Sequence, residues 1–357
     1  MPTYWVAPEI LTVRTSVPYI PRFSLGEHLS VVAPPSKPAK VQLSFEVTHI
    51  SGRPKELEIK HHYYYVGVGN DSIYCERNIG FGATVRLLIS QLYTEPTIRA
   101  NELYYRLVRS QLGVLLPPGR HLLDVATVAL LRAGLLPLHC AAVSREGQCL
   151  LIFAPPDTGK TFTALALRNQ GFSILSEDMA ITDGKTVWSC PFTGTFYHLI
   201  SHSNQRGWRG LTTRAYASAV ELFPPLARLV RPPIQSLWSL TGGLVQGSSR
   251  IGGVVFLRRS GTSLCMESLS GQRAFHFLQL CNRVEFTYDS NPALLAFASV
   301  DDSFDLTALR RRELEMLQKL GSQYPAVLVC SDDYREFPTA VRQIFASLNS
   351  SLVPSTV

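Results

Sequence analysis

The chain has 357 residues, enough for about two domains at roughly 150 residues each. Apolar residues make up 46% of it and charged residues 17%, so it can bury a substantial core and is not a disordered tail. The formal net charge of +7 suits an anionic partner such as a nucleotide. Because no Lys- and Arg-rich run occurs, the charge does not indicate nucleic-acid binding.

The sequence gives no sign of a membrane partner or of export. Its most hydrophobic stretch, 121–140, is interrupted by Asp124 and Arg132, and the first residues lack a basic segment followed by an apolar run. The seven cysteines are scattered without any C-x-x-C pair, which argues against a disulfide scaffold and against a zinc site. We therefore expect a cytoplasmic protein.

The N-terminal third changes character along its length. Residues 1–40 contain seven prolines and are predicted to form an irregular arm. Residues 41–90 are rich in β-branched and aromatic residues between Gly, Asn and Asp turns, which predicts strands. Apolar residues three and four apart predict helices over 96–113 and 121–134. The interval 41–133 is therefore expected to be β-rich and then helical.

The segment 136–184 has the pattern of an α/β phosphate-binding unit. It predicts strands over 138–143 and 149–154, joined by a tight turn, then a helix over 161–170 and a strand over 173–177. The rest of the chain predicts two further strands and four helices, over 252–259, 270–283, 292–300, 304–320, 326–331 and 335–349. We expect residues 134–357 to form one domain.

A P-loop holds phosphate with successive backbone N–H groups and a helix N-terminus, a lysine, and a hydroxyl that ligates Mg²⁺. The end of that pattern, Gly159-Lys160-Thr161, is intact here and lies between the predicted strand and helix. Together with Asp157 and Thr158, these residues are the candidates for nucleotide binding. The alternative is an ordinary surface turn before a helix.

The front of the loop departs from the P-loop pattern. Ala154 replaces the first glycine, and Pro155 and Pro156 remove two N–H donors. Asp157 adds a negative charge where phosphate would lie.

Two acids follow the strand after the helix. A phosphotransferase needs a carboxylate there to hold Mg²⁺, and often a second one to take the proton of the acceptor hydroxyl. Glu177 and Asp178 are the candidates, although adjacent strand residues point to opposite faces unless the strand ends or bends. If they do not both reach the site, Glu177 is a surface charge and only Asp178 matters.

His139 lies on the strand expected to form a hairpin with the P-loop strand. A lone histidine on an apolar strand is more often a core residue than a functional one.

The order of these features in 136–184 resembles HPr kinase/phosphorylase and the stand-alone HPr-kinase-related proteins, within the PEP-carboxykinase-like nucleotide-binding superfamily. The resemblance implies a P-loop domain of mixed β-sheet with flanking helices. Carried over by position, it makes His139 the active-site histidine near the transferred phosphate and Lys160 the phosphate lysine. It makes Glu177 and Asp178 the tandem acids, one a base and one a metal ligand. Thr161 and Asp178 would hold the metal.

The family also places an Arg-Gly beyond the acids, next to the phosphates. Arg206 is the candidate for that position, with Arg209 and Arg250 as rivals. The chain departs from the family in the front half of the loop and in having Glu as the first acid.

The function expected from these features is ATP- and Mg²⁺-dependent transfer of a phosphoryl group to a hydroxyl of a small molecule or a peptide. The altered loop keeps open a non-catalytic nucleotide-binding scaffold. An enzyme that uses transient phosphorylation to drive cyclisation, elimination or ligation is a further alternative. Family relatives often assemble, so a homo-oligomer is also open.

Overall fold

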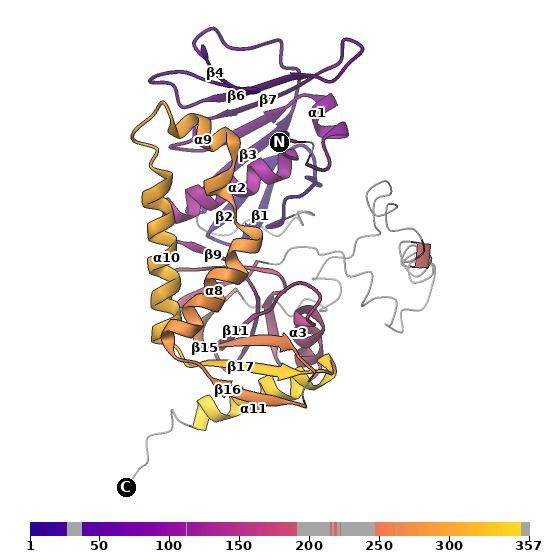
Figure 1. Ribbon diagram of the computed structural model, residues 1–357, viewed down its shortest axis with the longest axis vertical. Coiled ribbons are helices and arrows are strands. Elements are labelled where there is room, and N and C mark those ends of the chain that lie inside the picture. The colour runs from indigo at the N-terminus through magenta and orange to yellow at the C-terminus, as the bar shows by residue number, and fades with distance from the viewer. Residues whose placement is uncertain are drawn as a thin grey trace.

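The computed structural model describes residues 1–26, 38–111, 113–190, 247–261 and 263–350, with a few single positions between 191 and 246. It contains two β-sheets, drawn one above the other in Figure 1, with helix α2 between them and helix α10 alongside. This is an α/β architecture with mixed sheets and flanking helices, as predicted. In the described part of the chain, no helix combines the length and apolar character needed to cross a membrane.

The first sheet has eight strands in the order β1-β2-β3-β8-β7-β6-β5-β4. Strand β3 pairs in parallel with β2 on one side and with β8 on the other, and the remaining pairs are antiparallel. The strands are β1 Thr3–Ala7, β2 Leu11–Thr15, β3 Val41–Val47, β4 Ile59–His61, β5 Tyr64–Val66, β6 Ile73–Asn78, β7 Thr84–Ser90 and β8 Thr97–Ala100.

Two predictions for this region are wrong. Residues 3–15 form strands β1 and β2 rather than an irregular arm, because β2 is paired on both sides and buries Leu11 and Val13. Residues 97–100 form strand β8 rather than the start of a helix, because pairing with β3 and β7 holds them extended. Helix α1, Glu102–Leu107, begins only after Asn101, whose side chain accepts a hydrogen bond from the Tyr104 N–H.

The second sheet is mixed, with the order β12-β10-β11-β15-β14-β13-β9, and β17 pairs with both β15 and β16. Strands β11, β15 and β17 run parallel, so their carboxyl ends meet at one edge. The strands are β9 Leu136–His139, β10 Ala141–Arg145, β11 Gln148–Phe153, β12 Ser173–Ser176, β13 Met179–Thr182, β14 Thr186–Trp188, β15 Ser248–Arg259, β16 Cys265–Ser268 and β17 Ala326–Ser331.

Helices cover both faces of this sheet. Strand β11 directs Leu151 and Phe153 into the core that it shares with the first sheet, and Leu150 and Ile152 into a second core beneath α3 and α11. A strand that is buried on both faces has a continuous run of apolar residues, and β11 has such a run. The helices are α2 Pro118–Arg132, α3 Lys160–Arg168, α8 Gly271–Glu285, α9 Pro292–Ala298, α10 Leu306–Gln323 and α11 Phe337–Ser350.

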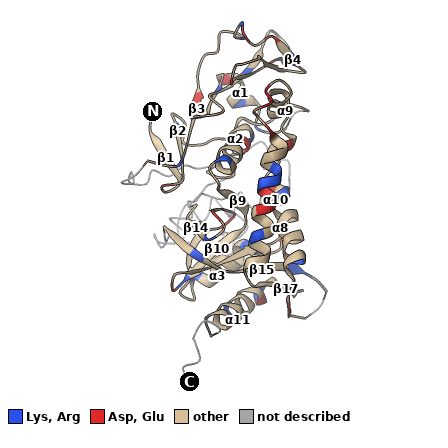
Figure 2. Ribbon diagram, turned by 90° about the vertical axis from the view of Figure 1, so that its left-hand side faces the viewer, with Lys and Arg blue, Asp and Glu red and all other residues tan. Residues whose placement is uncertain are grey.

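Helix α2 joins the two sheets. It contacts β3 and β8 of the first sheet and β9 of the second, and most of its side chains are buried. Figure 2 shows Lys and Arg scattered over many elements and interspersed with Asp and Glu along α10.

Candidate active site

The predicted strand, loop and helix around residue 160 are confirmed. Strand β11 ends at Phe153 and α3 begins at Lys160, one residue before the predicted start. Gly159 is the N-cap residue, with a φ of 116° that residues with a side chain rarely adopt. Glycine has no side chain to cap the helix, and within the described residues no side-chain cap hydrogen bond is made at this end. The first N–H groups of α3 are therefore available to an anion.

Three of the predicted site residues meet at one carboxylate oxygen. The Lys160 Nζ atom lies 2.6 Å from Asp178 Oδ1, and the His139 Nε2 atom lies 3.1 Å from the same oxygen. Burial by itself would raise the pKa of Asp178, but the Lys160 ammonium and the His139 imidazole hold that pKa well below its ordinary value. Asp178 is therefore an ionised carboxylate at neutral pH.

The two acids lie in the short connection between strands β12 and β13. Strand β12 ends at Ser176 and β13 begins at Met179, so Glu177 and Asp178 occupy a bend between them. Both acids reach the start of α3 for this reason: Asp178 contacts Lys160, and Glu177 accepts a hydrogen bond from the Thr161 hydroxyl. Glu177 is thus not a surface charge, and its exposed fraction is only 5%.

The electrostatic surroundings give the two acids different protonation behaviour. Burial, and after it the neighbouring Asp178 carboxylate, raise the pKa of Glu177 to about 7 against the opposing effects of Lys160 and Thr161. A carboxyl group that titrates near neutral pH can act as a general base, whereas one held fully ionised is better suited to a cation. The two neighbouring carboxyl groups therefore differ in their protonation near neutral pH.

The prediction of one continuous strand over 138–143 is wrong. The chain breaks at Cys140 into β9 and β10, and only β10 forms the hairpin with the P-loop strand β11. Strand β9 pairs instead with β13, which puts His139 directly opposite Met179, the residue after Asp178. This change of partner places the imidazole beside the acids. In the described part of the chain, the buried Nδ1 atom of the ring has no hydrogen-bond partner.

A buried polar network behind His139 was not foreseen from the sequence. The Asn282 side chain on α8 accepts a hydrogen bond from the His139 N–H at 3.0 Å and donates to Glu313 Oε1 on α10, also at 3.0 Å. Glu313 in turn accepts from Tyr288 and pairs with Arg310 at 2.6 Å. Two helices distant in sequence therefore fix the end of β9 that carries the imidazole. Asn282 lies among the buried residues of α8, beside Leu278 and Cys281.

Tyr334, near the other end of the chain, packs against the loop before α3. A Cβ atom on Gly159 would lie 3.0 Å from the Cβ atom of Tyr334, and the Phe162 and Tyr334 rings meet edge to face at 4.9 Å. Tyr334 follows β17, and the exposed Arg258 and Arg259 end β15, at the same edge of the sheet. Ligands of open α/β sheets bind at this edge.

The remaining predicted residues fall into two groups. Asp157 is exposed, with a φ of 59°, and Thr158 is buried; both lie in the loop before α3. Arg206 and its rival Arg209 lie outside the described residues. The other rival, Arg250, pairs with Gln148 at the beginning of β11, the end of the strand opposite the P-loop.

The oxygen donors fit a hard divalent cation. Among the described residues, no group of three or more His, Cys, Asp or Glu side chains could hold a metal by itself. Magnesium in phosphotransferases is held by one or two carboxylates together with substrate phosphates and water, so a smaller donor set suffices. The Thr161 hydroxyl and the Asp178 carboxylate are such a set; Glu177 contacts Thr161, and Lys160 pairs with Asp178.

Comparisons with known proteins give little beyond this geometry. No family model matches the chain, and no curated protein does. Among solved structures, the chain is similar to the HPr(Ser) kinase/phosphatase from Coxiella burnetii at 8% sequence identity and a TM-score of 0.29. The match covers 60% of this chain and 97% of that one. A likeness this small carries no weight for chemistry, which depends here on the residues of the site.

Proposed function

We propose that the protein is an ATP- and Mg²⁺-dependent phosphotransferase of the HPr-kinase type, acting on a hydroxyl of a small molecule or a peptide. The observation that carries the proposal is the convergence of Lys160 and His139 on Asp178, beside the Thr161–Glu177 contact and at an uncapped helix N-terminus. Residues 134–357 would form the catalytic part.

The phosphate-binding groups are the N–H groups of the first turn of α3 and the Lys160 ammonium. Because Pro155 and Pro156 supply no N–H, the helix N-terminus and Lys160 contribute a larger share of the binding than in a glycine-rich loop. Lys160 is paired with Asp178 in the ligand-free chain and exchanges that partner for phosphate. The His139 imidazole, oriented by its contact with Asp178, holds the phosphoryl group in position during transfer.

Thr161 and Asp178 would hold the magnesium ion, which supplies charge neutralisation on the phosphate oxygens. Glu177 is the general base. Its raised pKa, about 7, lets it accept the proton of the acceptor hydroxyl near neutral pH. The Thr161 hydroxyl has to release Glu177 for that step, because the two are hydrogen-bonded in the ligand-free chain.

The test combines nucleotide titration with turnover. Wild-type protein should bind ATP with Mg²⁺ saturably in isothermal titration and release ADP when serine-containing peptides and small alcohols are offered. Lys160→Ala should lose well over tenfold in transfer, because charge stabilisation is the main catalytic contribution in phosphoryl transfer. Lys185→Ala is the matched control, since Lys185 is exposed in the turn between β13 and β14.

One observation favours a second function, a nucleotide-binding scaffold. The loop has lost two donors to Pro155 and Pro156, and Asp157 is exposed within it. Saturable ATP binding with no ADP release on any acceptor would support the scaffold. The absence of saturable binding to any purine nucleotide with Mg²⁺ would exclude both functions.

A further inference from the structure

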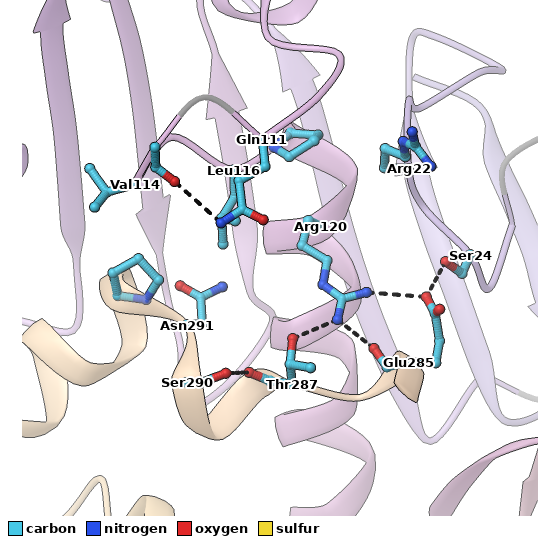
Figure 3. Close-up of a pocket in the computed structure, with 13 residues that line it drawn as sticks. Arg22, Ser24, Gln111, Val114, Leu116, Arg120, Glu285, Thr287, Ser290 and Asn291 are labelled. Carbon is cyan, nitrogen blue, oxygen red and sulfur yellow. Dashed lines mark hydrogen bonds and ion pairs between the residues drawn. The ribbon is translucent and has the colours of Figure 1, made fainter. Parts of the chain in front are cut away.

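A cavity of about 790 Å³ shares no lining residue with the candidate active site. It lies between the N-terminal part of the chain, including the loop and first turn that begin α2, and residues 285–292 after α8 (Figure 3). Its volume is within the range of small-molecule sites, about 300–1,000 Å³. The cavity lies between two parts of the chain, a common place for such sites.

One wall of the cavity is a fixed ion pair. The Arg120 Nη1 atom lies 3.1 Å from Glu285 Oε1, and the Arg120 Nη2 group donates to the Thr287 hydroxyl (Figure 3). The Ser24 hydroxyl donates to the same Glu285 oxygen. Arg120 also lies 3.8 Å from Asp124 Oδ1 behind the wall, so its charge is balanced by Glu285 and Asp124. Within the described residues, the second carboxylate oxygen of Glu285 has no hydrogen-bond partner and remains an acceptor.

Arg22 supplies a positive charge that the wall does not balance. In the described residues, its guanidinium takes part in no hydrogen bond or ion pair, and its side chain lies apart from the Arg120 cluster in Figure 3. Its φ of 66° is in the left-handed region, which costs a non-glycine residue on the order of 1–3 kcal/mol and is found where structure or function requires it. The lining thus has a net charge of one positive unit.

The rest of the lining is mixed. Val114 and Leu116 form an apolar side, and Gln111 and Ser290 add polar groups. An apolar wall with a few placed polar groups is typical of a small-molecule site. A phosphate dianion suits this lining poorly. It carries two negative charges, whereas the lining offers one unbalanced cation and also contains the Glu285 carboxylate, which would repel it.

We propose that this cavity binds a small monocarboxylic acid that also carries a hydroxyl or amine group. The Arg22 guanidinium pairs with the carboxylate, and the free oxygen of Glu285 accepts a hydrogen from the hydroxyl or ammonium. The side formed by Val114 and Leu116 covers the hydrocarbon part of the ligand. Binding needs neither nucleotide nor metal.

The experiment uses the full chain without nucleotide or Mg²⁺. Lactate, mandelate, 4-hydroxyphenyllactate, L-phenylalanine and L-tyrosine are screened by saturation-transfer NMR, and the best binder is titrated by calorimetry. Arg22→Gln should weaken binding at least about tenfold, the effect of losing one charge-assisted hydrogen bond. Arg14→Gln, at an exposed position on β2, should leave it unchanged. The primary amide of the best acid should bind at least tenfold more weakly than the acid.

The proposal fails if none of these acids binds saturably, if the amide binds as tightly as the acid, or if the two arginine variants behave alike. Unchanged circular dichroism and melting temperature for Arg22→Gln exclude misfolding as the cause of lost binding. Because nucleotide is absent throughout, a negative result here leaves the phosphotransferase proposal untouched.

Discussion

Replacing Glu177 by Gln should stabilise the protein strongly at alkaline pH and only slightly in mild acid. In the unfolded chain this carboxyl titrates near its ordinary pKa of 4.5, whereas in the folded chain burial and then Asp178 raise the pKa to about 7. Between these pH values the folded chain keeps a proton that the unfolded chain has released. Stability therefore falls as pH rises through that window. At 1.36 kcal/mol per pKa unit, the loss at pH 8 is roughly 3 kcal/mol.

Glutamine keeps an oxygen that can accept the Thr161 hydrogen bond but does not titrate. Urea denaturation followed by tryptophan fluorescence should give Glu177→Gln a free energy of unfolding up to about 3 kcal/mol above wild type at pH 8, and less than about 1 kcal/mol above it near pH 5. Asp178 does not disturb the comparison, because its lowered pKa keeps it ionised at both pH values. Glu58→Gln, at an exposed site, is the control. Equal effects at both pH values would refute the assignment of a raised pKa to Glu177.

Three further outcomes are expected. Turnover should rise with pH and level off above about 7 if Glu177 is the base, as a pH–rate profile would show. Asn282→Ala should destabilise the chain by roughly 1–3 kcal/mol for each buried partner left unsatisfied, the His139 N–H among them, measured by chemical denaturation. Gly159→Ala should cost about 1–3 kcal/mol from its φ alone. Adding Tyr334→Gly, which removes the Cβ atom that the new methyl group would meet, should recover only the steric part, so the double-mutant cycle should be non-additive.

The core of the candidate site could be predicted because its signals are local. Gly159, Lys160 and Thr161 lie between an apolar strand and a periodic helix, and Glu177 and Asp178 follow directly after the next strand. Chain order and strand polarity bring such residues together without any knowledge of distant segments.

The errors arose where pairing between distant segments decides the structure. The run 136–143 is apolar apart from His139, and nothing in it indicates that the chain changes partner at Cys140, from β13 to β11. Strand β2 is extended because β3 lies beside it in parallel, although its surroundings are rich in proline. Asn282 and Tyr334 come from segments more than a hundred residues away from the residues they hold.

The contact of both Lys160 and His139 with Asp178 Oδ1 has a consequence for selectivity among anions. Because the Lys160 ammonium already pairs with Asp178, an anion that binds Lys160 must displace this carboxylate. Asp178 then keeps only His139 of these two partners and lies beside the bound anion. Recognition becomes an exchange of counterions instead of a simple attraction. This exchange disfavours an anion that binds without a cation, because the displaced carboxylate repels it. An anion that binds together with its own cation avoids that repulsion.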